Sequence, residues 1–150
     1  MKIRVLGSAA GGGVPQWNCN APLSRAVREQ KPGFLVRTQS SIAASSDGES
    51  WAVFNASPDI REQIAASPEL QPRAKGALRH TPIKAVILTN ADVDHIAGLL
   101  SLREREPFIL YATQRVLKTL AENSIFQVLN PEVVERRELP LEGITPLEGP

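Results

Sequence analysis

One segment of the chain reads Ile83-Lys84-Ala85-Val86-Ile87-Leu88-Thr89-Asn90-Ala91-Asp92-Val93-Asp94-His95. Its first half is a short apolar run, which predicts a buried strand over residues 83–88. Its second half places two carboxylates, an amide and an imidazole within six residues. Loops at strand ends often carry functional groups, and oxygen and imidazole atoms are common metal ligands. The segment therefore points to a metal site.

Two interpretations of the acidic residues remain open. In the first, Asp94 is only the N-cap of a helix that begins near Ile96, and Asp92 is a solvated loop acid. In the second, Asp94 and His95 are catalytic metal ligands, with Asp92 as a further candidate. A metal site needs at least one more ligand. The other histidine, His80, is a poor choice, because a strand of roughly 20 Å separates it from this segment. The site is thus incomplete within these 150 residues.

Composition excludes several classes of protein. The 150 residues are 42% hydrophobic, which suits one domain with its own core. Seventeen basic and sixteen acidic side chains give a formal charge of +1, which does not favour a nucleic-acid partner or a membrane surface. A single cysteine fits a reducing compartment, and no apolar run is long enough to cross a bilayer. We expect a cytoplasmic protein without a membrane segment.

Local patterns predict alternating strands and helices. Strands are expected at residues 3–6, 34–45, 51–55, 83–88 and 108–111, with a weak one near 133–134, and helices at 57–66, 96–105 and 113–120. Ser57 and Thr113 are the expected N-caps, and residues 67–82 the main surface loop. The Asp47-Gly48 pair predicts a type I′ hairpin turn. This order indicates an α/β or α+β fold, a mixed sheet with flanking helices.

A glycine-rich loop, Gly7-Ser8-Ala9-Ala10-Gly11-Gly12-Gly13, follows the first strand. It lacks the Gly-Lys-Ser/Thr ending of a P-loop, and Pro15 and Trp17 do not suit a phosphate-binding helix start. Either the glycines allow two backbone segments to pack closely, or Gly11, Gly12 and Gly13 bind a small polar molecule or cofactor.

Four blocks of sequence occur in a characteristic order. They are residues 5–20 (VLGSAAGGGVPQWNCN), 37–43 (RTQSSIA), 55–60 (NASPDI), and the pair 94–95 (DH) with 98–104 (GLLSLRE). Taken together, they resemble the family of pyrroloquinoline quinone (PQQ) biosynthesis B proteins, a branch of the metallo-β-lactamase superfamily. The resemblance covers nearly the whole chain but only the N-terminal half of the family.

The resemblance implies that residues 1–150 form the first half of a four-layer αββα metallo-β-lactamase-like sandwich, with a metal between the two halves. The superfamily loop reads His-x-His-x-Asp-His. Asn90 and Asp92 stand where its first two histidines would be, whereas Asp94 and His95 match its last pair. This departure argues against a β-lactamase-type dinuclear hydrolase. It leaves one iron or other divalent metal, held by Asp94, His95 and histidines of a missing second half.

The family also carries three cysteines just after Trp17, which form a structural zinc clasp. Here the corresponding residues are Cys19, Ala21 and Ser24. Because two of the three thiolates are missing, we expect the clasp to be lost and no structural zinc to bind.

Three functions follow as alternatives. In the first, the complete protein is a metal-dependent enzyme that hydroxylates a tyrosine-derived PQQ precursor with O₂. In the second, it is a non-catalytic carrier that binds PQQ or its precursor and takes part in its transport to the periplasm. In the third, the chain is an inactive truncated fragment, which either self-associates through an uncovered sheet face or needs the missing second half as its partner.

Overall fold

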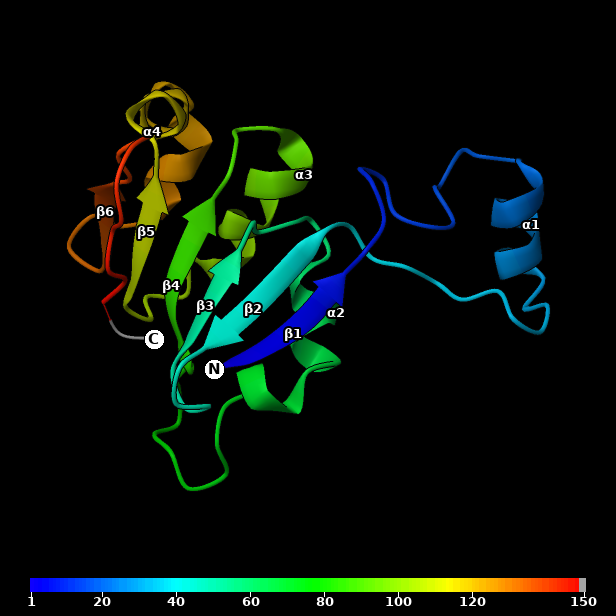
Figure 1. Cartoon of the computed structure of the whole chain (residues 1–150), viewed down its shortest axis with the longest axis horizontal. Coiled ribbons are helices and arrows are strands. Elements are labelled where there is room, and N and C mark those ends of the chain that lie inside the picture. The colour runs from blue at the N-terminus through cyan, green and yellow to red at the C-terminus, as the bar shows by residue number, and fades with distance from the viewer. Residues whose placement is uncertain (149–150) are drawn as a thin grey trace.

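The strands follow one another in chain order across a single six-stranded sheet (Figure 1). The computed structural model describes residues 1–148. The strands are β1 (Lys2–Gly7), β2 (Ser41–Ser45), β3 (Trp51–Phe54), β4 (Ile83–Leu88), β5 (Phe108–Ala112) and β6 (Val134–Glu138). β1, β2 and β3 pair antiparallel, whereas β3 to β6 pair parallel. The predicted mixed sheet of an α/β protein is confirmed.

Helices connect the parallel strands and cover one face of the sheet. The α-helices are α1 (Pro22–Arg28), α2 (Ile60–Ala65), α3 (Val93–Ile96) and α4 (Gln114–Glu122), and the 3-10 helices are η1 (Pro68–Leu70), η2 (Ala97–Leu102) and η3 (Ser124–Val128). All of them except α1 contribute side chains to one hydrophobic core. Within residues 1–148, no helix has the length and apolar character needed to span a membrane.

The core lies between the sheet and these helices. Alternate residues of the central strands point into it, as a strand with one covered face requires. Its fully buried members include Val53, Val86 and Leu110 from the sheet, with Ile60 and Leu99 from the helices. The predicted surface loop 67–82 also contributes to the core, because η1 buries Leu70 there.

The opposite face of the sheet is only partly covered. Over β4 and β5 the last described residues cross it, and Leu139 and Leu147 pack against Ile87 and Tyr111. Over β1 no such cover exists within residues 1–148. The side chains of this part remain exposed: Ile3 at 61%, Val5 at 62% and, on β2, Ile42 at 37%. An apolar sheet face of this kind is normally buried in a folded protein.

The hairpin between β2 and β3 differs from its predicted form. Five residues, 46–50, connect the two strands, and of the Asp47-Gly48 pair only Gly48 has a positive φ (+83°). Asp47 instead accepts backbone hydrogen bonds from Ser50 at 2.9 Å and Glu49 at 2.7 Å. These bonds lower the pKa of its carboxyl group. The type I′ prediction is wrong because the Asp47 side chain organises a longer loop.

Three other predicted elements are shorter than expected. Within 34–45, only β2 is a regular strand. The helix predicted over 57–66 begins at Ile60, because Ser57 is fully buried and does not cap it. The helix predicted over 96–105 is divided between α3 and η2. Thr113 is the N-cap residue of α4, but its side chain makes no capping hydrogen bond.

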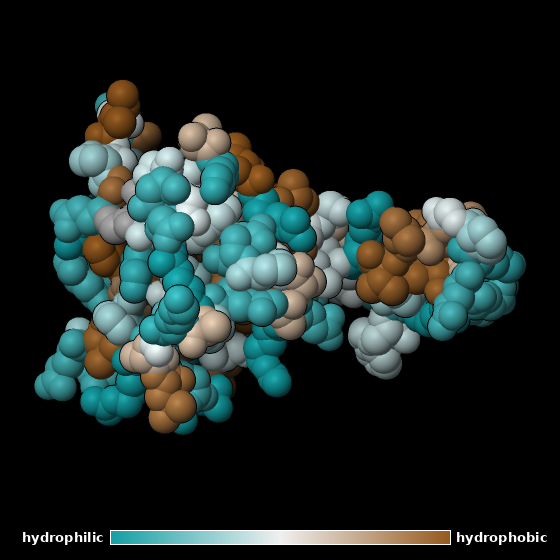
Figure 2. All heavy atoms as spheres, turned by 90° about the horizontal axis from the view of Figure 1, so that it is seen from below, coloured by the Kyte–Doolittle hydropathy of each residue, from teal (hydrophilic) through white to brown (hydrophobic). Residues whose placement is uncertain are grey.

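Residues 10–37 extend away from the sheet as an arm that carries α1 (Figure 1). Two backbone hydrogen bonds of 2.8 Å between Val14 and Arg37 close its base. The helix was not predicted, although Pro22 at its first position is a typical start signal. Hydrophobic residues gather on the surface of the arm (Figure 2). Those with large exposed side chains are Trp17, Leu23, Phe34, Leu35 and Val36.

Candidate metal centre

The candidate site lies at the carboxyl end of β4, where the chain turns into α3. β3, β4 and β5 are parallel, so their carboxyl ends share one edge of the sheet. Binding sites of layered α/β proteins commonly lie at this edge. The buried strand and the acidic segment after it therefore occupy the places that the sequence predicts.

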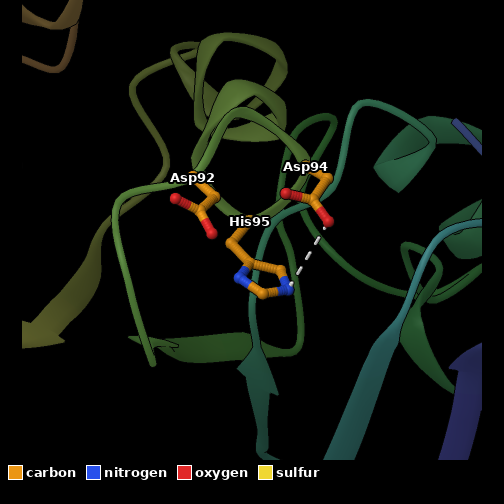
Figure 3. A group of neighbouring side chains, drawn as sticks. All are labelled: Asp92, Asp94 and His95. Carbon is orange, nitrogen blue, oxygen red and sulfur yellow. Dashed lines mark ion pairs between the residues drawn. The ribbon is translucent and has the colours of Figure 1, made fainter. Parts of the chain in front are cut away.

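Asp92, Asp94 and His95 turn their side chains toward one another (Figure 3). One donor atom from each lies within 4.8 Å of the other two, and His95 Nε2 is 3.8 Å from Asp94 Oδ2. Two ligands bound to one metal at about 2.1 Å each lie at most about 4.2 Å apart. His95 and Asp94 can therefore share an ion as they stand, and Asp92 lies near enough to be a candidate third ligand.

Exposure differs among the three side chains. Those of His95 and Asp94 are 18% and 24% exposed, whereas Asp92 is an exposed residue. The half-buried pair is thus held in place by its surroundings, and Asp92 forms the solvent side of the cluster. Carboxylate and imidazole groups in this arrangement fit a divalent transition metal.

Asn90 orients the imidazole of His95. Its Oδ1 accepts a hydrogen bond from the backbone N–H of Asp92 at 2.9 Å, which identifies that atom as the oxygen of the amide. The same oxygen lies 2.5 Å from His95 Nδ1. Because an oxygen without a hydrogen can only accept, Nδ1 carries the proton. The free lone pair is then on Nε2, which faces Asp94, and this tautomer can bind a metal.

The N-cap interpretation of Asp94 is wrong. α3 begins at Val93, so the N-cap residue is Asp92. The Asp92 carbonyl accepts hydrogen bonds from the backbone N–H groups of His95 and Ile96, while its side chain makes no capping bond. Asp94 lies within the first turn of α3, and its carboxylate faces His95.

A close backbone contact fixes α3 and η2 to the segment after β3. Ala56 donates its N–H to the carbonyl of His95 at 2.8 Å, and Gly98 donates its N–H to the carbonyl of Ala56 at 2.8 Å. A β-carbon at Gly98 would lie only 2.1 Å from the carbonyl oxygen of Ser57. Only glycine allows the two segments to approach so closely.

Asn55 joins the same two segments from the other side. Its Oδ1 accepts hydrogen bonds from the backbone N–H and the hydroxyl of Thr89, at 2.9 and 3.0 Å. Its φ of +63° lies in the left-handed region, which asparagine tolerates better than most residues. Asn90 belongs to the predicted segment, but its role toward His95 was not predicted. Asn55 and Gly98 were not predicted as parts of the site, because their partners lie far away in the sequence.

The glycine loop passes beside Asp94. A β-carbon at Gly11 would lie 3.1 Å from Asp94 Oδ2, and Gly12, with a φ of +91°, donates its N–H to Gln39 Oε1 at 2.9 Å. At Gly7 two backbone segments pack closely, since a β-carbon there would lie 2.0 Å from the carbonyl oxygen of Gln39. Close backbone packing is confirmed at Gly7. Ligand binding by residues 11–13 stays a prediction.

His80 lies apart from the cluster, before β4, as the length of the strand predicts. Its Nε2 accepts a hydrogen bond from the backbone N–H of Arg73 at 2.7 Å, and its Nδ1 is 3.2 Å from the carbonyl oxygen of Ala77. Both ring nitrogens are engaged within their own loop. The ring of His80 therefore supports that loop.

Cys19 lies in the arm. The hydroxyl of Ser24 and the backbone N–H of Ala21 donate hydrogen bonds to its sulfur, and both lower the pKa of the thiol. The guanidinium of Arg28 donates to the carbonyl oxygens of Cys19 and Gln16, and so joins α1 to the preceding turn. The loss of the zinc clasp stays a prediction.

Comparison with protein families and curated proteins gives consistent matches. The model of the family described as "Beta-lactamase superfamily domain" matches residues 50–149. The chain is 54% identical over 149 residues to "Coenzyme PQQ synthesis protein B" of Xanthomonas oryzae pv. oryzae, a match that covers 99% of this chain and 49% of that protein. The protein of the same name from Rhizobium meliloti is 51% identical over 150 residues, or 99% and 48%. The chain spans about half the length of these relatives.

Two solved structures support the fold. The Zn(2+)-bound PqqB from Methylobacterium extorquens matches with a TM-score of 0.90 and 54% identity, over 94% of this chain and 50% of that one. A diphosphatase from the PhnP family matches with a TM-score of 0.67 and 27% identity, over 95% and 52% of the two chains. The arrangement of strands and helices is therefore that of half a metallo-β-lactamase-like domain.

The Asn90–His95 hydrogen bond leads to a prediction about the ring proton. We expect neutral His95 to carry its proton on Nδ1, and substitution Asn90→Ala to produce a mixture of the two tautomers because the only acceptor at Nδ1 is removed. Long-range ¹H–¹⁵N NMR of the imidazole distinguishes the two forms. Asn123→Ala, at the C-cap position of α4, is the matched control and should leave the signal unchanged. A wild-type ring protonated at Nε2 would contradict the assignment.

Proposed function

This chain belongs to the beta-lactamase superfamily, and from that premise we propose that it is the N-terminal half of a metal-dependent PQQ biosynthesis protein. In its complete form this protein hydroxylates a tyrosine-derived PQQ precursor. The observation that carries the proposal is the convergence of Asp92, Asp94 and His95 at the end of β4, with Nε2 of the histidine free to bind a metal.

The donor set fits one divalent metal ion. Asp94 and His95 would be its principal ligands, with Asp92 as a third on the solvent side. The zinc in the related PqqB structure supports a divalent metal in this family. We favour iron because a carboxylate and imidazoles that leave open positions are the donors of non-haem iron oxygenases. Asn90 stands where a first-site histidine would be and makes a second ion beside it unfavourable, since its amide already serves His95.

The chemistry of hydroxylation sets further requirements. A redox-active metal would supply the activation of O₂, and conversion of a C–H group to C–OH with release of water also consumes two electrons and two protons. A two-electron reductant must therefore take part. The residues described here would hold the ion and orient its ligands, with Asn90 setting the histidine tautomer and Asp92 reaching solvent.

Completion of the site requires groups from outside residues 1–148. Within these residues, Asp92, Asp94 and His95 are the one group of metal-binding side chains that converges. The exposed apolar face of β1 and β2 is the surface that a second sheet would cover. Since the chain spans about half the length of its relatives, we propose that the second half supplies both the remaining ligands and this cover.

The metal proposal predicts a specific loss of affinity. Substitution Asp94→Ala or His95→Ala should weaken binding of Zn²⁺, or of Fe²⁺ without oxygen, by at least about tenfold, because loss of one ligand costs more than about 1.4 kcal/mol. Isothermal titration of the 150-residue chain measures the affinity. His80→Ala is the matched control, since His80 is the other histidine and lies apart from the cluster. Equal affinity of the wild type and both cluster variants would refute the site.

A carrier role is the second candidate. It is favoured by the glycine loop beside a cluster whose ligand set is incomplete, an arrangement that suits holding a polar quinone without converting it. In this role the protein binds PQQ or its precursor and takes part in its movement to the periplasm. We then expect PQQ to bind the metal-free chain, as measured by equilibrium dialysis with a chelator present. Binding that disappears with the chelator returns support to the metal-dependent function.

An inactive fragment is the third candidate, and the exposed sheet face favours it. If this face has no other cover, the chain should self-associate, and substitution Val5→Lys should weaken the association because it places a charge on the shared surface. Sedimentation velocity over a range of concentrations measures this effect. Leu78→Lys, which changes a fully exposed residue in a loop, is the control. A monomer that melts cooperatively at every concentration would count against the fragment.

A further inference from the structure

The structure links α2 to the candidate metal centre through a chain of polar contacts. Asp59 occupies the N-cap position of α2, yet its carboxylate makes no capping bond and faces Gln39 instead. Its Oδ2 accepts hydrogen bonds from both N–H groups of Gln39, the backbone one at 2.8 Å and the side-chain Nε2 at 3.0 Å.

These contacts fix the direction of the Gln39 side chain. With Nε2 held by the Asp59 carboxylate, Oε1 must point the other way, where it accepts the N–H of Gly12 at 2.9 Å. Gln39 is only 7% exposed, and Gln63 donates to its carbonyl oxygen at 2.8 Å. The side-chain amide is therefore held by Asp59 and Gly12, and the backbone of Gln39 by Gln63, so the buried amide has little freedom to turn.

The chain of contacts ends at the glycine loop, which lies beside the proposed metal ligand Asp94. Gln39 holds Gly12, and the residue before it, Gly11, lies beside Asp94. A β-carbon at Gly11 would be 3.1 Å from Oδ2 of Asp94. On its other side, that carboxylate faces His95 Nε2 at 3.8 Å. The glycine loop thus limits the rotation of Asp94 away from the imidazole.

We infer that Asp59 and Gln39 are positioning residues of the metal centre, which hold the glycine loop against Asp94 and so keep its carboxylate directed at His95. This inference rests on the proposed metal site. Neither residue is near enough in the sequence to the acidic segment to be associated with it, and neither contacts the donor atoms directly. Outer contacts of this kind typically change metal affinity by about ten- to a hundredfold.

The test uses Co²⁺, whose visible absorption reports the geometry of its ligands as well as its affinity. Gln39→Leu and Asp59→Ala should each weaken Co²⁺ binding about tenfold and alter the spectrum. Asp59→Asn should restore binding to within about threefold of the wild type, because its amide oxygen can still accept both Gln39 donors. A residue that only stabilises the fold would not change the spectrum of bound Co²⁺.

Two further variants keep the outcome decisive. Gln71→Leu is the matched control, because it removes a glutamine whose side chain donates to the carbonyl of Ala65 and lies outside the network. Gly11→Ala changes the part of the glycine loop that lies beside Asp94. Gly11 is exposed and its φ is not positive, so we expect the variant to fold. We expect at least about threefold weaker binding, since the new methyl group displaces the Asp94 carboxylate.

The possible results separate the two proposals. If Asp94→Ala binds Co²⁺ as well as the wild type does, the metal site and this inference both fail. If Asp94→Ala loses binding while Gln39→Leu, Asp59→Ala and Gly11→Ala retain it with an unchanged spectrum, the metal site stands and the positioning role is overturned. If Asp59→Asn is as weak as Asp59→Ala, the hydrogen-bonding route through Gln39 is overturned as well.

Discussion

The candidate site depends on the contact between Gly98 and the backbone of Ala56 and Ser57. The two segments exchange hydrogen bonds at 2.8 Å, from Ala56 to His95 and from Gly98 to Ala56, and the missing side chain of Gly98 lets them touch. One segment follows β3 and the other follows β4. The contact therefore fixes the segments that follow two neighbouring strands to each other. His95 takes part through its backbone carbonyl, so the backbone that carries the imidazole is held in place.

Two asparagine side chains also help to hold the candidate site in place. Asn55 ties the end of β4 to the segment after β3, and Asn90 sets the proton of His95. Neither asparagine needs a charge, so they orient the ligands without competing for a cation. Asn90 thus supports His95, and the candidate metal ligands are the two carboxylates and one imidazole.

The two faces of the sheet differ in their cover. The helix-covered face contains a continuous core, whereas the other face has, within the described residues 1–148, only a small buried cluster, over β3 to β5. Ile3 and Val5 remain open on that face. The candidate metal ligands lie at the end of β4, where both faces of the sheet meet. One further segment could therefore supply both ligands and cover, as the proposed second half requires.

Sequence alone determined the elements whose signals are local. The mainly apolar residues 83–88, which include one charged residue, Lys84, form β4 with the predicted bounds, because a strand rich in Val, Ile and Leu is stabilised by burial on both faces. The acidic segment after it was identified for the same reason: its donors are neighbours in the chain. The family resemblance and the mixed sheet were also read correctly from ordered motifs.

Only the tertiary structure decided what the donors face. Asp94 could equally have capped a helix, but α3 begins at Val93 and so places Asp94 within its first turn. The glycine loop beside Asp94 and the contact of Gly98 with Ser57 became visible only once distant segments were brought together. A hydrogen bond or a steric contact between residues far apart in the chain has no periodicity or spacing that a single sequence records.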